Sequence, residues 1–407
     1  MSVPRNLYSF VTLLALLVAI SSCTSGTNRE AASPASSPAA GGVPRFEFDP
    51  SWPKMPLPNQ WTFGEVGGVG VDAQGHIWVI QRPWTIWGRE LAAVTGEGEC
   101  CRAAPSVIEF DYEGNVVQSW PELQQFKAAP GTPVGQSHPR VGPEGALLWE
   151  SKPGPYGEWG RREHTVYIDY KDNVWVSVDE SHVIYKFTRN GKHLFTIGEK
   201  DKTGGSNDTK RLGRPTNMVV DQETNDLFVS DGYTNRRVIV FDAETGAYRR
   251  HWGAYGNPPD DVKMPPYDPK SPPSKQMDTV HGIALSRDGM VYVADRANNR
   301  IQVFDRSGKF VREVFIAKET TDVGSTYGVA VSPDPQQQWL YVNDGSAGKI
   351  MILRRKDLEI VGSFGSQGRH AGQFLSAHSM TVDQRGNIYV GESRGRRVQR
   401  FRLVSGG

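Results

Sequence analysis

One short pattern, present in six copies, constrains the fold of this 407-residue chain more than any other feature. Its clearest copy runs from Val280 to Phe304, where three apolar runs (Ile283 to Leu285, Val291 to Ala294 and Ile301 to Phe304) are separated by turns. Runs this short, bounded by Gly, Asp and Asn, predict strands joined in hairpins rather than helices. The chain is therefore expected to be all-β.

Aligned on its first residue, the pattern recurs at intervals of 97, 52, 65, 46 and 51 residues. The first residues of the six copies, called the head positions below, are Gly67, His164, Thr216, His281, Tyr327 and His378. Repeats of about 40 to 50 residues with several strands each are typical of β-propellers, whose ring leaves few exposed strand edges. The sequence therefore predicts a six-bladed β-propeller over residues 45–407.

Three details of this propeller also follow from the pattern. The first strand of each blade should line the central axis, because its turn of small residues packs closest there. Arg45 to Phe48 precedes the first copy and should pair with the last blade to close the ring. The two long intervals carry insertions rich in Pro and Gly, at about residues 83–162 and 254–278, and the first should include strands such as Val107 to Phe110.

The first 44 residues are expected to lie outside the propeller. Arg5 precedes an apolar run from Val11 to Ile20, which is too short for a membrane helix of roughly 20 residues. Ile20-Ser-Ser-Cys23 fits a bacterial lipobox, which predicts a signal peptide over residues 1–23 and lipidation of Cys23. An ordinary cleaved signal peptide that ends in Cys is the alternative. Residues 24–44 have the composition of a flexible tether.

These features predict an exported protein, anchored by lipid to the bacterial cell envelope on its periplasmic or outer face. The net charge is +1, from 46 basic and 45 acidic residues, so bulk electrostatics favours no nucleic acid partner. The remaining cysteines, Cys100 and Cys101, are adjacent. They could form a disulfide ring, stay free or bind a soft metal, and we favour a structural role in a long loop.

Histidine stands at every second head position, as His164, His281 and His378. Equivalent residues on alternate blades of a six-bladed ring are related by about a threefold axis, so the three imidazoles would point at one spot in the channel. Three neutral His nitrogens with an open fourth position form the ligand set of a reactive zinc site. Each His alone could be a buried residue satisfied by hydrogen bonds, but the alternation favours a metal.

Two copies end in similar motifs, at Asp231 to Phe241 (D-G-Y-T-N-R-R-V-I-V-F) and at Asp295 to Phe304 (D-R-A-N-N-R-I-Q-V-F). A degenerate version runs from Glu392 to Phe401. These stretches resemble the NHL type of propeller repeat, which ends in D-x-x-N-x-R-[IV]-x-x-F. NHL propellers are common as binding scaffolds, so the fold alone does not choose a function.

Longer stretches resemble one family more specifically. They are Q-R-P at residues 81–83, H-x-x-x-I-D at 164–169, P-T-N-M-V-V-D with V-S-D-G-Y-T-N at 215–235, and the segments 280–304 and 377–391. Together they resemble the peptidyl-α-hydroxyglycine α-amidating lyases over most of residues 63–403. The resemblance implies a six-bladed propeller with zinc held by three His on alternate blades. It also implies a carbon–nitrogen lyase that splits a carbinolamide into an amide and glyoxylate.

The resemblance further implies two catalytic residues. Tyr233, in S-D-G-Y, would transfer a proton, and Arg82, in Q-R-P, would bind the substrate carboxylate or the tyrosine. A neighbouring Arg and a zinc ion favour phenolate, and Arg offers a bidentate fork to a carboxylate. Alternatively, Tyr233 could cap a blade and Arg82 could pair with a blade carboxylate. Arg296, in A-D-R, also matches the family, but we expect it to be structural and to pair with an Asp or Glu.

One position departs from the family. The residue after the last zinc-binding His is usually Asp, which helps to bind a structural calcium ion with two backbone carbonyls. Those carbonyls would belong to Val69 and Val166 here, but the Asp position is Ser379. A neutral hydroxyl in place of a charged ligand puts calcium occupancy in question.

The sequence thus predicts a lipid-anchored, zinc-dependent lyase of the peptidylamidoglycolate type that acts as a monomer on a small molecule or a peptide C-terminus. Two other classes remain. One is a non-enzymatic NHL scaffold at the cell envelope. The other is a propeller hydrolase such as a lactonase, which binds calcium through Glu, Asn and Asp, and the head positions lack that set.

Overall fold

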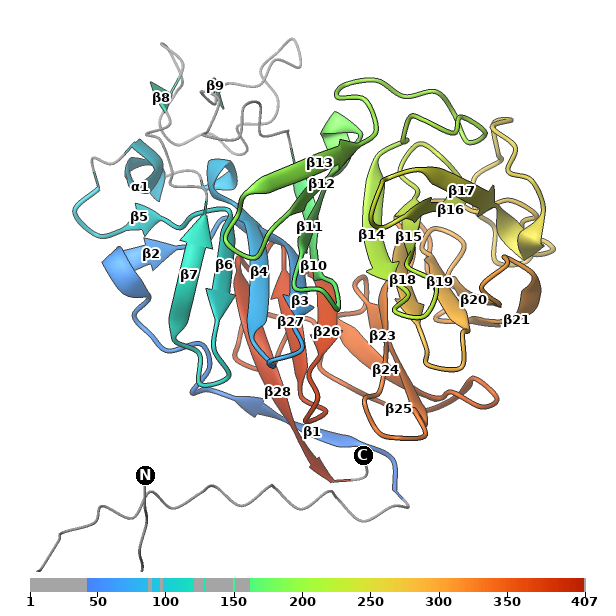
Figure 1. Cartoon of the computed structure of the whole chain (residues 1–407). Helices are drawn as coiled ribbons and strands as arrows, with labels where there is room; N and C mark the ends of the chain where they lie inside the picture. The colour runs from blue at the N-terminus through green and yellow to red at the C-terminus, as the bar shows by residue number, and fades with distance from the viewer. Residues whose placement is uncertain are drawn as a thin grey trace, which may run out of the picture. The chain divides into compact units, whose positions relative to one another are not determined.

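The computed structural model describes residues 42–86, 90–95, 98–120 and 162–405, together with the backbone of two short strands at 127–128 and 149–150. Six four-stranded sheets, each antiparallel throughout, account for almost all of the regular structure in these residues. Figure 1 shows them in chain order, from the blue β3 and β4 to the red β26, β27 and β28. The predicted all-β, six-bladed propeller is confirmed.

The blades begin with the strand nearest the axis. Blade 1 consists of β3 (Glu65–Val71), β4 (Ile77–Arg82), β6 (Val107–Phe110) and β7 (Val116–Trp120). Blade 2 consists of β10 (Glu163–Ile168), β11 (Val174–Val178), β12 (Val183–Phe187) and β13 (His193–Ile197). Blade 3 consists of β14 (Pro215–Val220), β15 (Asp226–Asp231), β16 (Arg237–Asp242) and β17 (Tyr248–Trp252).

Blade 4 consists of β18 (Val280–Leu285), β19 (Val291–Asp295), β20 (Arg300–Phe304) and β21 (Phe310–Phe315). Blade 5 consists of β22 (Thr326–Val331), β23 (Trp339–Asp344), β24 (Lys349–Arg354) and β25 (Glu359–Phe364). Blade 6 consists of β26 (Ala377–Val382), β27 (Ile388–Glu392), β28 (Arg397–Ser405) and the N-terminal strand β1 (Arg45–Asp49).

The core lies between the blades. Central strands such as β4 and β15 are buried along their whole length, whereas the outermost strand β13 is mostly exposed. Six apolar clusters lie between successive blades, and one of them packs Trp78 and Trp120 of blade 1 against Val174 and Phe187 of blade 2. A sheet that packs on both faces needs apolar residues on both, which explains the continuous apolar runs of the inner strands.

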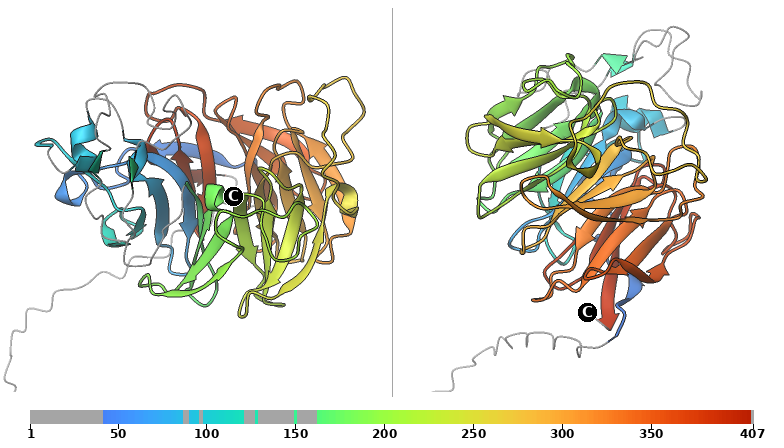
Figure 2. Two further views of the ribbon diagram at one scale, coloured as in Figure 1. Left: turned by 90° about the horizontal axis from the view of Figure 1, so that it is seen from above. Right: turned by 90° about the vertical axis from the view of Figure 1, so that its right-hand side faces the viewer.

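The ring closes through β1. Arg45–Asp49 pairs antiparallel with β28, so blade 6 combines the two ends of the propeller, as predicted for Arg45 to Phe48. Figure 2 shows the blue β1 beside the red β28 near the C-terminus. Asp49 also accepts two hydrogen bonds from Arg400 of β28, at 2.9 and 2.6 Å.

The first strands of the six blades contact one another in a closed circle, from β3 through β10, β14, β18 and β22 to β26 and back. The head positions therefore surround the axis. Blade 1 approaches blade 2 so closely that a Cβ at Gly67 would lie 2.5 Å from the carbonyl oxygen of Glu163. Only glycine fits this head position without a shift of the backbone.

The first predicted insertion, residues 83–162, contains the expected strand at Val107–Phe110, which is β6, and also β7, so two strands of blade 1 lie within it. It contains a short helix, α1 (Leu91–Thr95), and the strand β5 (Arg102–Ala103), which pairs in parallel with β2 (Trp61–Thr62). Farther along, β8 (Lys127–Ala128) pairs with β9 (Trp149–Glu150).

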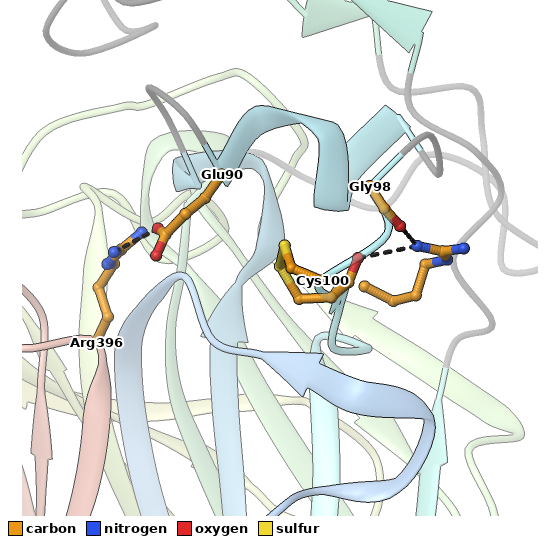
Figure 3. Close-up of a disulfide and its surroundings, with 6 residues drawn as sticks. Glu90, Gly98, Cys100 and Arg396 are labelled. Carbon is orange, nitrogen blue, oxygen red and sulfur yellow. Dashed lines mark hydrogen bonds and ion pairs between the residues drawn. A yellow bond between two sulfur atoms is a disulfide. The ribbon is translucent and has the colours of Figure 1, made fainter.

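Cys100 and Cys101 form a disulfide in the segment between α1 and β5 (Figure 3). The Arg102 guanidinium donates to the carbonyl oxygens of Gly98 and Cys101. Cys100 and Cys101 thus form a disulfide rather than free thiols or a metal site. Near this disulfide, Glu90 forms an ion pair of 2.6 Å with Arg396, which ties this insertion to blade 6.

The predicted signal peptide, Cys23 and nearly all of the predicted tether lie outside the described residues. Within those residues, no helix is long and apolar enough to cross a membrane.

Candidate metal centre

The structure brings the three head-position histidines together. His164, His281 and His378 are each the second residue of a blade's first strand, on blades 2, 4 and 6. All three are buried, and their ring centroids lie 4.8 to 5.0 Å apart. One ring nitrogen of each lies within 4.8 Å of those of the other two. The threefold arrangement expected from the alternation is present.

The other three head positions orient these rings. His164 Nδ1 donates to the carbonyl oxygen of Thr216 at 2.9 Å, and His378 Nδ1 donates to that of Gly67 at 2.7 Å. His281 Nδ1 donates in the same way to the carbonyl oxygen of Tyr327. Because a carbonyl only accepts, Nδ1 must carry the proton, and each Nε2 has a lone pair that can bind a metal.

The imidazoles are neutral. Burial is the main cause that holds the pKa of each well below the ordinary value of 6.5. The neighbouring imidazoles of His378 and His281 add to this effect at His164, Arg296 adds to it at His281, and Arg82 adds to it at His378. A neutral imidazole is the form that binds a metal.

This donor set fits zinc. It offers three neutral nitrogens whose tautomers are set by backbone carbonyls, and no carboxylate or thiolate joins the group in the described residues. Three protein ligands leave a fourth position for water or substrate, which is the pattern of reactive rather than structural zinc sites.

Tyr233 lies against this centre. Its hydroxyl oxygen is 3.2 Å from His164 Nε2 and 3.1 Å from His281 Nε2. Tyr233 belongs to the loop after β15, and this loop packs closely against Val280, the first residue of blade 4. A Cβ at the preceding Gly232 would lie 2.0 Å from the carbonyl oxygen of Val280, so glycine is required there.

Three arginines surround Tyr233. The guanidinium carbons of Arg162, Arg214 and Arg296 lie 5.0, 4.8 and 5.4 Å from its ring centroid. Arg296 Nη1 also donates to the Tyr233 hydroxyl oxygen at 3.4 Å. Three positively charged groups therefore lie close to the Tyr233 ring.

One buried carboxylate holds two of these arginines. Asp179 accepts hydrogen bonds of 2.8 Å from both Arg162 and Arg214. Burial acts to lower the pKa of Arg162, but Asp179, Tyr233 and Glu180 more than offset it and raise that pKa above its ordinary value. Arg162 therefore stays charged beside the phenol.

The expectation for Arg296 was wrong. In the described part of the chain it forms no ion pair with a carboxylate. Its Nε instead donates to the carbonyl oxygen of Val323 at 2.9 Å, and its guanidinium lies 4.7 Å from the ring centroid of Tyr327. Together with its contact to Tyr233, this places Arg296 at the centre rather than in the scaffold.

Arg82 is fully buried beside the centre. Its Nε donates to the carbonyl oxygen of Glu163 at 2.7 Å, and its Nη1 forms an ion pair of 2.8 Å with Glu65. The blade carboxylate considered as an alternative partner is thus present. Its Nη2 is buried without a hydrogen-bond partner among the described residues. The Tyr233 hydroxyl is contacted by Arg296 instead, so binding of a substrate carboxylate stays the prediction for Arg82.

Sequence reasoning missed Arg162 and Arg214. Each stands two residues before a head position, and each has a φ of 64°. Thr279 and Ser376 occupy the same position in blades 4 and 6, with φ of 57° and 63°. Aligning this column of the repeat would have shown two arginines at one rim of the channel.

The residues expected to hold calcium do not fit the ion well. The Ser379 hydroxyl is buried without a hydrogen-bond partner, and a Cβ at Gly391 would meet both it and the Val69 side chain. Calcium prefers six to eight oxygen ligands with carboxylates among them. No group of acidic side chains suited to a metal adjoins Ser379, Val69 or Val166 in the described residues.

A second group of possible ligands, Asp72, His76 and Glu109, already surrounds a cation. Arg189 of blade 2 donates to Asp72 at 2.6 Å and also to Glu109, while His76 lies 2.6 Å from Glu109. This group is an ion-pair network between blades 1 and 2.

Comparison with known proteins finds an NHL repeat and relatives among the amidating enzymes. A model of the NHL repeat matches residues 278–304. The peptidyl-glycine alpha-amidating monooxygenase of Mus musculus is 27% identical over 250 residues, 59% of this chain and 23% of that protein. The peptidyl-alpha-hydroxyglycine alpha-amidating lyase 1 of Drosophila melanogaster is 25% identical over 397 residues, 89% of this chain and 65% of that protein. The chain thus spans about a quarter of the mouse protein. A solved streptogramin B lyase has a TM-score of 0.49 at 13% identity, covering 88% of this chain and 98% of that one.

Proposed function

Since the chain is related to the amidating lyases, as its motifs predicted, we propose that it is a zinc-dependent carbon–nitrogen lyase of this type. It splits an α-hydroxyglycine amide into a primary amide and glyoxylate. The observation that carries this proposal is the Tyr233 hydroxyl, which lies at two of the three converging imidazoles inside a ring of arginines.

His164, His281 and His378 would hold the zinc ion through their Nε2 atoms. When bound, the ion acts as a Lewis acid that polarises and acidifies the substrate hydroxyl.

Tyr233, as phenolate, removes the proton of the substrate hydroxyl. The electron pair of that O–H bond forms the carbonyl of glyoxylate as the C–N bond breaks. The proton then passes to the amide nitrogen, so no water is consumed and the phenolate is restored. Proton transfer by a positioned group typically accelerates a reaction by about 10² to 10⁴ fold.

Arg82 orients the substrate. Its Nη2 is a buried donor without a hydrogen-bond partner in the described residues, and the α-carboxylate of hydroxyglycine is the acceptor that would satisfy it. Arg162, Arg214 and Arg296 hold Tyr233 in place through their contacts with its ring.

The location of the protein forms part of the proposal. The lipobox that ends at Cys23 supports lipid anchoring at the cell envelope, and the bulk charge gives no reason to expect a nucleic acid partner. The enzyme would act there as a monomer on small substrates or exposed peptide ends.

Metal analysis combined with one assay tests the proposal. The purified protein should contain about one zinc per chain and release glyoxylate from α-hydroxyhippurate. His281→Ala/His378→Ala should lose both, whereas His370→Ala, at an exposed site, should keep both. Wild-type protein without bound metal would overturn the enzymatic function and favour a binding scaffold. Zinc without glyoxylate release would indicate a different zinc chemistry.

A further inference from the structure

A hollow of about 700 Å³ lies between blades 6 and 1. Four arginines line it, Arg369, Arg394, Arg396 and Arg397, and on the side of blade 1 it is bounded by Glu65 and Thr85. It is called the arginine pocket below. None of these residues was assigned a role from the sequence.

The pocket contains more positive than negative charge. Arg396 pairs with Glu90 and Arg397 pairs with the buried Glu392, each at 2.6 Å. The carboxylate of Glu65 forms an ion pair with Arg82. The side chains of Arg369 and Arg394 are exposed, and neither has an ion-pair or hydrogen-bond partner among the residues that the structure describes.

Two residues that line the pocket, Glu65 and Thr85, also contact Arg82. Glu65 binds the Arg82 guanidinium, and the Thr85 hydroxyl donates to the Arg82 carbonyl oxygen at 2.7 Å. Arg82 in turn donates through Nε to the carbonyl oxygen of Glu163 at 2.7 Å, directly before His164 in the chain. A substrate held by Arg82 therefore has the arginine pocket as its neighbour.

The repeat places Arg394 on the same rim as Tyr233. Asp231 ends β15 and Glu392 ends β27, and Tyr233 and Arg394 each follow two residues later. Both strands run toward the end of the channel where the histidines stand, since each pairs antiparallel with the first strand of its blade. The two side chains therefore belong to equivalent loops of blades 3 and 6.

We propose that the arginine pocket is a substrate subsite for a carboxylate on the part that leaves as the amide. In a peptide, this carboxylate is the side chain of an acidic residue directly before the hydroxyglycine. The inference rests on the proposed function, with the α-carboxylate of hydroxyglycine at Arg82. Arg369 and Arg394 then bind the second carboxylate, because an unpaired guanidinium offers a planar fork that matches it.

Paired substrates test the preference. Acetyl-Glu-α-hydroxyglycine should be cleaved with a kcat/KM about tenfold above that of its Gln counterpart, mainly through a lower KM, as expected for one added charged interaction. Arg369→Gln/Arg394→Gln should abolish this preference while zinc content and turnover of the Gln substrate stay unchanged. Arg45→Gln, at an exposed arginine of β1, is the matched control and should keep the preference.

A binding measurement separates this inference from the proposed function. Calorimetry on the zinc-loaded protein with acetyl-Glu-amide and acetyl-Gln-amide requires no turnover. The Glu probe should bind more tightly, and the double variant should remove the difference. If neither substrate is cleaved but the Glu probe binds in this way, the lyase function fails and the anionic pocket stands. Equal binding of both probes, or a preference that survives the double variant, overturns the pocket.

Discussion

At the scale of single residues, the six head positions divide into two sets of three. His164, His281 and His378 offer ligand nitrogens, and the carbonyls of the three intervening head positions fix their tautomers. One column of the repeat therefore supplies both the ligands and the groups that orient them. Under the proposed function, metal binding and proton transfer would fall to different residues, because the Tyr233 side chain does not hydrogen-bond to the Nδ1 atoms that orient the three rings.

Tyr233→Phe is expected to retain about one zinc per chain and to lose turnover by at least about 100-fold, because only the proton-transfer group is removed. Glyoxylate release and zinc content measured on the same preparation test this. Tyr170→Phe, at an exposed tyrosine of blade 2, is the control and should behave as wild type. Unchanged turnover in Tyr233→Phe would exclude this residue from the mechanism.

At the scale of elements, the closure of blade 6 depends on a five-residue strand. The strand β1 pairs with β28, and its last residue, Asp49, is buried against Arg400. Burial acts to raise the pKa of Asp49, but hydrogen bonds from Ser51 and Arg400 hold it at about 2. The carboxylate therefore stabilises the closed ring when it is ionised.

Asp49→Ala is expected to destabilise the propeller by about 3 kcal/mol at neutral pH, because it leaves the Arg400 charge buried without a partner. The folded pKa lies below the unfolded value of about 3.9, so this stabilisation is present above about pH 4 and is lost as pH falls toward 2. Denaturant unfolding of wild type and variant at several pH values measures it. Glu47→Ala, at an exposed residue of the same strand, should change little. A variant that matches wild type at neutral pH would contradict this role of β1.

At the scale of the whole molecule, the centre joins three blades that are not neighbours in the ring. A ligand that binds only the folded state at 100 times its Kd adds about 2.7 kcal/mol to stability. The three buried imidazoles have folded pKa values well below 6.5, so the unfolded chain takes up protons first as the solution is acidified. The stability of the metal-free protein is therefore full above about pH 6.5 and falls below it.

Chelation is accordingly expected to lower the Tm at pH 8, and the Tm of the chelated protein should fall further between pH 7 and pH 5. Thermal unfolding with and without EDTA measures both effects. In His281→Ala/His378→Ala, EDTA should have no effect and the dependence on pH below 6.5 should be weaker. Identical Tm values for wild type with and without EDTA would argue against a metal that links the blades.

The sequence by itself determined the six blades, the closing strand and the three histidines. These follow from periodicity, because equivalent positions of a repeat become equivalent positions in a ring. Only the tertiary structure decided what surrounds Tyr233. Arg162, Arg214 and Arg296 come from three different blades, and their convergence depends on how loops cross the interfaces between blades. Strand patterns specify which residues are buried within a blade, but they do not specify which side chains meet between loops. For the same reason, only the tertiary structure shows that Arg369 and Arg394 lack carboxylate partners in the described residues. The nearby carboxylates of Glu65, Glu90 and Glu392 pair with other arginines.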